Sequence, residues 1–201
     1  MDLHREFSDI DIYLFDQLLK GRIGPRDRVL DAGCGSGRNL TYLLRSGIDV
    51  SAVDRNPHAI AEVRELAGRL APHLPAGQFR VEPVDRLSFP DATFTVVISS
   101  AVLHFANDDG EFDRMVDAMW RTIVPGGMLF ARLATTIGIE TRVRPLGRRR
   151  FLLPDGSERY LADERQLMDC TTRLGGQLLD PLKTTLVQDQ RAMTTWVVRK
   201  R

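Results

Sequence analysis

The sequence is poor in cysteine and has no long apolar run. Cys34 and Cys170 are too few for a disulfide framework, and neither belongs to a Cys-x-x-Cys metal pattern. No stretch approaches the roughly 18 unbroken apolar residues of a membrane span, and the first residues lack the apolar core of a signal peptide. We therefore expect a cytoplasmic, soluble protein without a membrane partner or a metal site.

The sequence also lacks an excess of either charge. Its 28 Lys and Arg residues oppose 27 Asp and Glu residues, a formal net charge of +1. Such a chain has no overall field to attract nucleic acid or an anionic membrane, so a nucleic-acid substrate is disfavoured. With 201 residues, of which 43% are hydrophobic, the chain is expected to form one domain over 1–201.

Apolar strand-like stretches alternate with amphipathic helical patterns over most of the chain. The strands are predicted at 28–32, 49–53, 79–81, 94–100 and 128–134, with two more near 182–188 and 193–199. Helical patterns separate them, including one that opens with Asn56 as N-cap and Pro57, and one that opens with an Asp163 and Gln166 capping box. This rhythm predicts an α/β fold with a doubly wound, mainly parallel sheet.

Two segments depart from that rhythm. Residues 1–24 contain an amphipathic helix with Ile10, Leu14 and Leu18 on one face, which we expect to form a helical cap over the glycine-rich turn. Residues 136–162 carry an arginine-rich run followed by Pro-Asp-Gly between apolar stretches, which predicts a hairpin insertion or lid.

Three glycines follow the first predicted strand. Gly33, Gly35 and Gly37 stand where ligands bind in open parallel sheets, and glycine allows a ligand to approach the backbone closely. Asp54 ends the next strand, where a carboxylate accepts both hydroxyls of a ribose. These features indicate a nucleoside cofactor, although a tight turn and a helix cap are the structural alternatives. Arg38 occupies the position of the third glycine of a dinucleotide-binding GxGxxG motif, but a nicotinamide-dependent oxidoreductase stays open on this evidence.

Taken with its flanks, VLDAGCGSGRNL (29–40) closely resembles motif I of the class I S-adenosylmethionine-dependent methyltransferases. The segments LSFPDATFTVVISSAVLHF (87–105) and RTIVPGGMLF (121–130) resemble the family's fourth-strand and fifth-strand regions, in the family's order. The resemblance implies a Rossmann-like, seven-stranded sheet with an antiparallel last strand. It also implies methyl transfer from S-adenosylmethionine, giving S-adenosylhomocysteine, and it is nearest to the type 11, small-molecule branch.

The resemblance assigns the cofactor-binding residues. Asp31, Gly33, Gly35 and Gly37 would shape the site for the methionine portion, with Cys34 packed in the same turn, and Asp54 would hold the ribose. The remaining positions are Arg55 along the adenine face, Val84 and Asp85 at the ring edge, and Ser99 near the methionine end. Pro83 stands where the family often has an acid, so Asp85 would substitute for it.

The acceptor side is less determined by the sequence. His104, on the turn after the fourth strand, is either a general base or a residue that packs or orients the acceptor. Tyr13 and two arginines of the insertion, Arg144 and Arg148, are the candidate acceptor-binding residues, and the arginines would suit an anionic small molecule. A solvated arginine run and a cofactor-binding module without catalysis are the alternatives. The acceptor, the methylated atom and the oligomeric state stay open.

Overall fold

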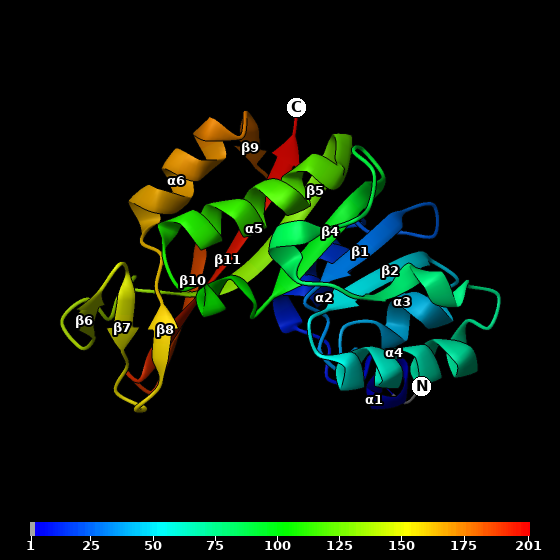
Figure 1. The fold of residues 1–201 in the computed structure, drawn as a ribbon, viewed down its shortest axis with the longest axis horizontal. Helices are drawn as coiled ribbons and strands as arrows, with labels where there is room; N and C mark the ends of the chain where they lie inside the picture. The colour runs from blue at the N-terminus through cyan, green and yellow to red at the C-terminus, as the bar shows by residue number, and fades with distance from the viewer. Residues whose placement is uncertain (1–2) are drawn as a thin grey trace.

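A computed structural model describes residues 3–201, so the first two residues of the predicted cap lie outside the described residues. Its main sheet runs in the order β10-β11-β5-β4-β1-β2-β3, and the short strand β9 pairs with β11 (Figure 1). The strands are β1 (Arg28–Ala32), β2 (Asp49–Asp54), β3 (Phe79–Val81), β4 (Phe94–Ser100), β5 (Ile123–Thr135), β9 (Gly176–Leu178), β10 (Lys183–Val187) and β11 (Arg191–Lys200).

Strands β3, β2, β1, β4 and β5 are parallel, whereas β11 runs antiparallel to β5, β10 and β9. The predicted doubly wound, Rossmann-like sheet with an antiparallel last strand is therefore confirmed. Strand β9, which was not predicted, brings the sheet to eight strands. Because the chain order reverses between β1 and β4, the carboxyl ends of these two strands form a topological switch point, where such sheets bind ligands.

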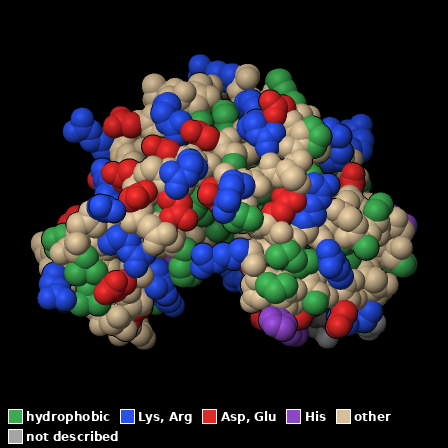
Figure 2. Space-filling view, in the orientation of Figure 1, with side chains coloured by type: hydrophobic (Ala, Val, Ile, Leu, Met, Phe, Trp, Pro, Cys, Tyr) green, Lys and Arg blue, Asp and Glu red, His purple; other side chains and the backbone are tan. Residues whose placement is uncertain are grey.

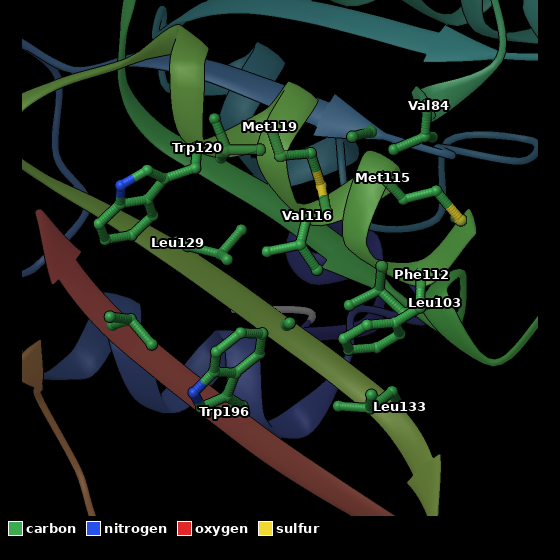
Figure 3. Close-up of a cluster of buried hydrophobic side chains, with 14 of the residues drawn as sticks. Val84, Leu103, Phe112, Met115, Val116, Met119, Trp120, Leu129, Leu133 and Trp196 are labelled. Carbon is green, nitrogen blue, oxygen red and sulfur yellow. The ribbon is translucent and has the colours of Figure 1, made fainter. Parts of the chain in front are cut away.

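Helices cover both faces of the sheet and enclose two apolar cores. On one face, α2 (Ile12–Leu19), α3 (Thr41–Arg45) and α4 (Pro57–Leu70) bury Leu14, Leu43 and Val63. On the other face lie α5 (Asp109–Thr122) and α6 (Glu164–Arg173). Figure 3 shows Trp120 and Val116 of α5 directed toward Leu129 of β5. The apolar stripes of these helices account for their position, since burial of such side chains contributes about 1.5–3 kcal/mol each.

Helix caps follow the sequence signals, with one difference. The Asn56 side chain accepts the His58 N–H at 3.0 Å with Pro57 as the first residue of α4, as predicted. The Asp163 carboxylate accepts the Gln166 N–H at 2.7 Å. The Gln166 side chain, however, donates to the Tyr160 hydroxyl instead of returning to Asp163, so only half of the predicted capping box forms.

The insertion forms a small sheet of three antiparallel strands, β6 (Arg144–Gly147), β7 (Arg150–Leu152) and β8 (Glu158–Tyr160), at one end of the molecule (Figure 1). The Pro-Asp-Gly signal lies in the turn between β7 and β8, as predicted. Arg149 ties this sheet to α6 and α5, because its guanidinium lies 2.6 Å from Asp163 and 3.2 Å from Asp109. Within residues 3–201, no helix combines the length and apolarity needed to cross a membrane.

Candidate active site

A cavity of about 410 Å³ opens at the carboxyl ends of β1, β2 and β4. Its size lies in the range of pockets that hold drug-sized ligands. Seven of the residues predicted to bind a cofactor line it: Gly33, Cys34, Gly35, Asp54, Arg55, Val84 and Asp85. Figure 2 shows the surface hollowed between the insertion sheet and the side that carries α3 and α4, with Lys and Arg side chains bordering the hollow. We name the cavity of about 410 Å³ the first cavity.

The glycine turn forms the first cavity's wall and is bound to the neighbouring strand. The N–H groups of Gly33 and Cys34 both donate to the Val53 carbonyl, at 2.8 and 3.0 Å. Gly33 has φ +83°, and a Cβ there would lie 2.5 Å from a methyl carbon of Val102. Only glycine fits this position without strain or a clash, so the turn is held close to the strand ends by backbone geometry.

The Asp54 carboxylate is fixed by the same turn. One oxygen accepts the Gly35 N–H at 3.0 Å and the other accepts the Asn56 N–H at 2.8 Å. A carboxylate has about four lone-pair sites, so this half-buried group keeps acceptor capacity for a ligand in the first cavity. The cap of α4 comes from Asn56, which leaves Asp54 free of that role.

Three predicted cofactor residues do not line the first cavity. Gly37 packs against α4, where a Cβ would lie 3.1 Å from Val63. Ser99 is fully buried on the opposite side of β4, and Ser100 lines the cavity in its place, because successive side chains of a strand point to opposite faces. Asp31 is buried on β1, on the sheet face that also carries Ser100.

A buried aspartate that was not predicted from the sequence joins the N-terminal segment to the carboxyl ends of β4 and β5. Asp11 precedes α2, and its carboxylate accepts from the Ser100 hydroxyl at 3.1 Å and from the Arg132 guanidinium at 3.2 Å. The Arg38 guanidinium donates to Ser100 at 3.1 Å and lies 3.6 Å from Asp11. The segment before α2 is therefore bound across the carboxyl ends of β4 and β5.

A second cavity, of about 250 Å³, lies beside the first. The β7–β8 hairpin, β5 and the β10–β11 hairpin provide its walls. Its lining residues are Ala101, His104, Arg132, Ala134, Leu153, Asp155, Ser157, Arg159, Val187, Arg191 and Met193. Ala101 lines both cavities and has a left-handed backbone with φ +64°. This residue therefore borders both cavities.

The turn after β4 (Leu103–Phe105) directs neighbouring side chains to different cavities. Phe105 lines the first cavity, whereas His104 lines the second and is only 7% exposed. The His104 Nδ1 accepts the Ala134 N–H at 3.2 Å. Burial, together with the positive charges of Arg159, Arg191 and Arg132, lowers the pKa of His104 to about 4. The ring is therefore neutral at pH 7, and its proton is on Nε2.

Comparison with known proteins gives the family. Residues 30–131, which include most of β1, the glycine turn, β2 and β4, match the model of the type 11 methyltransferase domain family. The chain belongs to the class I S-adenosylmethionine-dependent methyltransferases. The glycine turn, Asp54 and the turn that carries His104 all lie inside the matched segment.

Relatives of this chain differ in what their names say they methylate. It is 35% identical over 118 residues to a ubiquinone biosynthesis O-methyltransferase of Methylocella silvestris, covering 57% of this chain and 44% of that protein. It is 27% identical over 154 residues to the EEF1A lysine methyltransferase 4 of Mus musculus, covering 70% of this chain and 58% of that protein. The chain thus spans about half the length of the curated relatives it matches.

A solved structure shares the fold of this chain over nearly the whole length of the chain. The 1,6-didemethyltoxoflavin-N1-methyltransferase of Burkholderia thailandensis, solved with 1,6-didemethyltoxoflavin and S-adenosylhomocysteine, superposes with a TM-score of 0.71 at 20% identity. The superposition covers 99% of this chain and 81% of that one. The likeness extends beyond the matched domain to the insertion and the N-terminal segment.

The predicted acceptor residues of the methyltransferase lie outside both cavities. Arg144 and Arg148 are exposed on the insertion sheet and are not among the residues that line either cavity. Tyr13 lies on α2, with its hydroxyl bonded to Thr185 and its ring 5.2 Å from the Arg132 guanidinium. The arginines of the second cavity are Arg132, Arg159 and Arg191. Arg132 was detectable in sequence, as a charge inside the apolar run MLFARLA.

Proposed function

We propose that this chain transfers a methyl group from S-adenosylmethionine to a small-molecule acceptor by in-line displacement. The observation that carries the proposal is that Ala101 borders two neighbouring cavities. The first is lined by the glycine turn that resembles the family's cofactor-binding motif, and the second is small and walled in part by the insertion. In this proposal, residues 1–201 act as one unit in which the N-terminal cap (1–24) and the insertion (136–162) enclose the acceptor.

The residues of the first cavity suit the cofactor. We assign Asp54 to the ribose hydroxyls, Arg55 to the adenine face, and Val84 with Asp85 to the ring edge. When bound, S-adenosylmethionine supplies a methyl carbon on a sulfonium, so the leaving group is part of the cofactor. The protein's own task is to orient the acceptor and to exclude water.

Asp31 provides an independent test of whether these residues suit S-adenosylmethionine. Both oxygens of this buried carboxylate lack a hydrogen-bond partner among residues 3–201. Burial and, to a smaller extent, the nearby charge of Asp54 raise the pKa of Asp31 to about 7, although the positive charge of Arg38 lowers it. A buried acceptor group without a donor favours a cationic ligand, and we assign Asp31 to the ammonium of the cofactor's methionine portion.

This assignment makes cofactor affinity depend on pH. A bound ammonium lowers the pKa of Asp31, so binding releases a proton and the affinity for S-adenosylhomocysteine is expected to rise as pH increases from 6 to 8. Asp31→Asn is expected to remove most of this pH dependence and to weaken binding at pH 8. Calorimetric titrations in two buffers of different ionisation enthalpy measure the proton release. An unchanged pH profile in the variant would contradict the assignment.

Asp31→Asn is expected to weaken cofactor binding but to stabilise the unliganded protein against unfolding. Because folding raises the pKa of Asp31 above its ordinary value of 3.8, the unliganded protein loses stability as pH rises from about 4 to about 7. Asp31→Asn is therefore expected to stabilise the unliganded protein at pH 8 by roughly 2–4 kcal/mol. Denaturant unfolding of both proteins at pH 8 provides this comparison.

We propose that His104 orients the acceptor as a hydrogen-bond donor and is not the general base. A neutral ring whose Nδ1 accepts a backbone N–H carries its proton on Nε2. Nε2 can then donate to an acceptor atom in the second cavity but cannot remove a proton from it. The depressed pKa supports this role, because protonation of the ring at neutral pH is unfavourable.

Two substitutions separate these roles. His104→Asn has an amide oxygen that can accept the Ala134 N–H and an amide N–H that can donate, so it is expected to keep kcat within about threefold. His104→Ala removes the donor and is expected to raise KM by about tenfold. Steady-state kinetics from pH 5.5 to 8.5 test this. If His104 were the general base, kcat would instead fall by about 10²–10⁴-fold in both variants.

The proposed function is tested with an acceptor panel. Formation of S-adenosylhomocysteine is measured with small phenols, amines, thiols and carboxylic acids, and with a lysine-containing peptide. Turnover with one class of small molecule supports the proposal. Turnover with the peptide alone would overturn the small-molecule assignment, and cofactor binding without any turnover would favour a binding module.

A further inference from the structure

We propose that the second cavity binds a carboxylate, so that the acceptor is a compact monocarboxylic acid with an apolar body. This inference rests on the proposed function, because it takes the second cavity as the acceptor site. It follows from which arginines reach the cavity and which of them are already neutralised by neighbouring carboxylates.

Two guanidinium groups of the cavity have no ion-pair partner among the described residues. In the described part of the chain, 3–201, no carboxylate lies within 4.0 Å of Arg159 or Arg191. Arg159 is half-buried on β8, and its guanidinium lies 5.0 Å from the centre of the Phe105 ring. Arg191 begins β11, on the opposite wall. The guanidinium groups come from two separate elements and line the same small space.

The arginine-rich run of the insertion behaves differently. Arg149 pairs with Asp163 and Asp109, and Arg150 donates to the Ala106 carbonyl at 3.3 Å and lies 3.7 Å from Glu158. Arg142 lies 3.8 Å from Asp189. These three arginines are used to hold the insertion and the β10–β11 turn in place. Arg159 donates to the Glu158 carbonyl at 2.7 Å, but that contact lies within β8 and ties no other element to the insertion. Because neither Arg159 nor Arg191 pairs with a carboxylate of residues 3–201, we take both as groups available to a ligand.

The charges around the cavity favour a single negative charge on the ligand. The guanidinium groups of Arg132, Arg159 and Arg191 face two carboxylates, Asp155 in the cavity lining and Asp11 at 3.2 Å from Arg132. Because Asp11 is shared with Arg38, which lies 3.6 Å away, at least one positive charge of the second cavity is uncompensated, and His104 is neutral at pH 7. A carboxylate balances that charge, whereas a phosphate dianion would add repulsion with Asp155.

The remaining lining residues describe the rest of the ligand. Leu153, Val187 and Met193 provide apolar surface, and the Ser157 hydroxyl and the His104 Nε2–H provide further donors. At about 250 Å³ the cavity is smaller than typical drug-sized pockets. The volume and the lining residues suit an aromatic or branched aliphatic acid with one carboxylate toward the arginines.

The test uses the intact chain saturated with S-adenosylhomocysteine, with benzoate as the probe. Calorimetry is expected to detect benzoate binding, and the neutral isostere benzamide is expected to bind at least about tenfold more weakly. Arg159→Gln and Arg191→Gln should each weaken benzoate by about tenfold, because each removes a charge-assisted contact. Arg69→Gln, an exposed arginine on α4, is the matched control and should leave benzoate affinity unchanged.

Several results would overturn the inference. One is that benzamide binds as tightly as benzoate, and another is that neither Arg159→Gln nor Arg191→Gln changes the affinity for benzoate. A third is that Arg144→Gln or Arg148→Gln weakens benzoate binding more than these two variants do. A fourth is that phenyl phosphate binds more tightly than benzoate. S-adenosylhomocysteine is titrated first into every variant, so a misfolded variant is recognised by lost cofactor affinity. Failure of the wild-type chain to bind that cofactor would sink the proposed function itself, whereas failure of benzoate alone would sink only this inference.

Discussion

Ala101→Asn is expected to lower the rate of methyl transfer by about 100-fold while leaving the affinity for S-adenosylhomocysteine within about threefold of wild type. Ala101 lines both cavities, so under the proposed function a longer side chain there obstructs the place where acceptor and cofactor would meet. Asparagine is chosen because it tolerates the left-handed backbone that Ala101 adopts, with φ +64°. The fold should therefore be retained.

The measurement combines calorimetry with turnover of the acceptor that the panel identifies. Ala101→Gly is the matched control: it keeps the left-handed backbone, adds no atoms, and should retain most of the turnover. Wild-type turnover in Ala101→Asn would show that the reacting groups do not meet at this residue. A loss of cofactor affinity equal to the loss of turnover would place Ala101 in the first cavity alone.

Asp54→Ala is expected to weaken S-adenosylhomocysteine binding by about 100-fold, the second large effect. Hydrogen bonds to charged groups contribute about 1.5–3 kcal/mol each, and a ribose offers two hydroxyls to this carboxylate. The substitution also removes the acceptor of the Gly35 N–H, so the glycine turn loses one of its anchors. Both effects act on the first cavity and not on the second.

Two controls separate these contributions to affinity. Asp54→Asn keeps one oxygen for the backbone and is expected to lose only about tenfold, because a neutral acceptor binds a hydroxyl more weakly than a carboxylate does. Asp49→Ala removes an exposed carboxylate at the other end of β2 and should leave cofactor affinity unchanged. Thermal unfolding of each unliganded variant reports whether the fold itself is altered.

The sheet could be predicted from the sequence because its signals are local. The third and fourth strands were predicted at 79–81 and 94–100, where β3 and β4 lie. Periodicity and glycine or proline boundaries contain this information. The short strand β9 begins at the second of two glycines and has no pattern of its own, and only its pairing with β11 defines it.

The site was less predictable than the sheet, because tertiary contacts decide which side chains reach a cavity without a partner of their own. Ser99 and Ser100 are indistinguishable in sequence, and the face that each occupies follows from the register of β4, which shifts between Phe94 and Val96. Arg144 and Arg148 have the same chemistry as Arg159 and Arg191, but only the folded chain brings the latter pair to one cavity. Asp11 and His104 acquire their partners across β4 and β5, far apart in sequence.

The central claim is that the glycine turn and Asp54 form a cofactor site for S-adenosylmethionine and not for a nicotinamide dinucleotide. Calorimetric titration of the wild-type chain with S-adenosylhomocysteine and, separately, with NADH tests it most directly. The account predicts saturable binding of S-adenosylhomocysteine at one site, weakened in Asp54→Ala, and no binding of NADH. Binding of NADH without S-adenosylhomocysteine, or full S-adenosylhomocysteine affinity in Asp54→Ala, would contradict it.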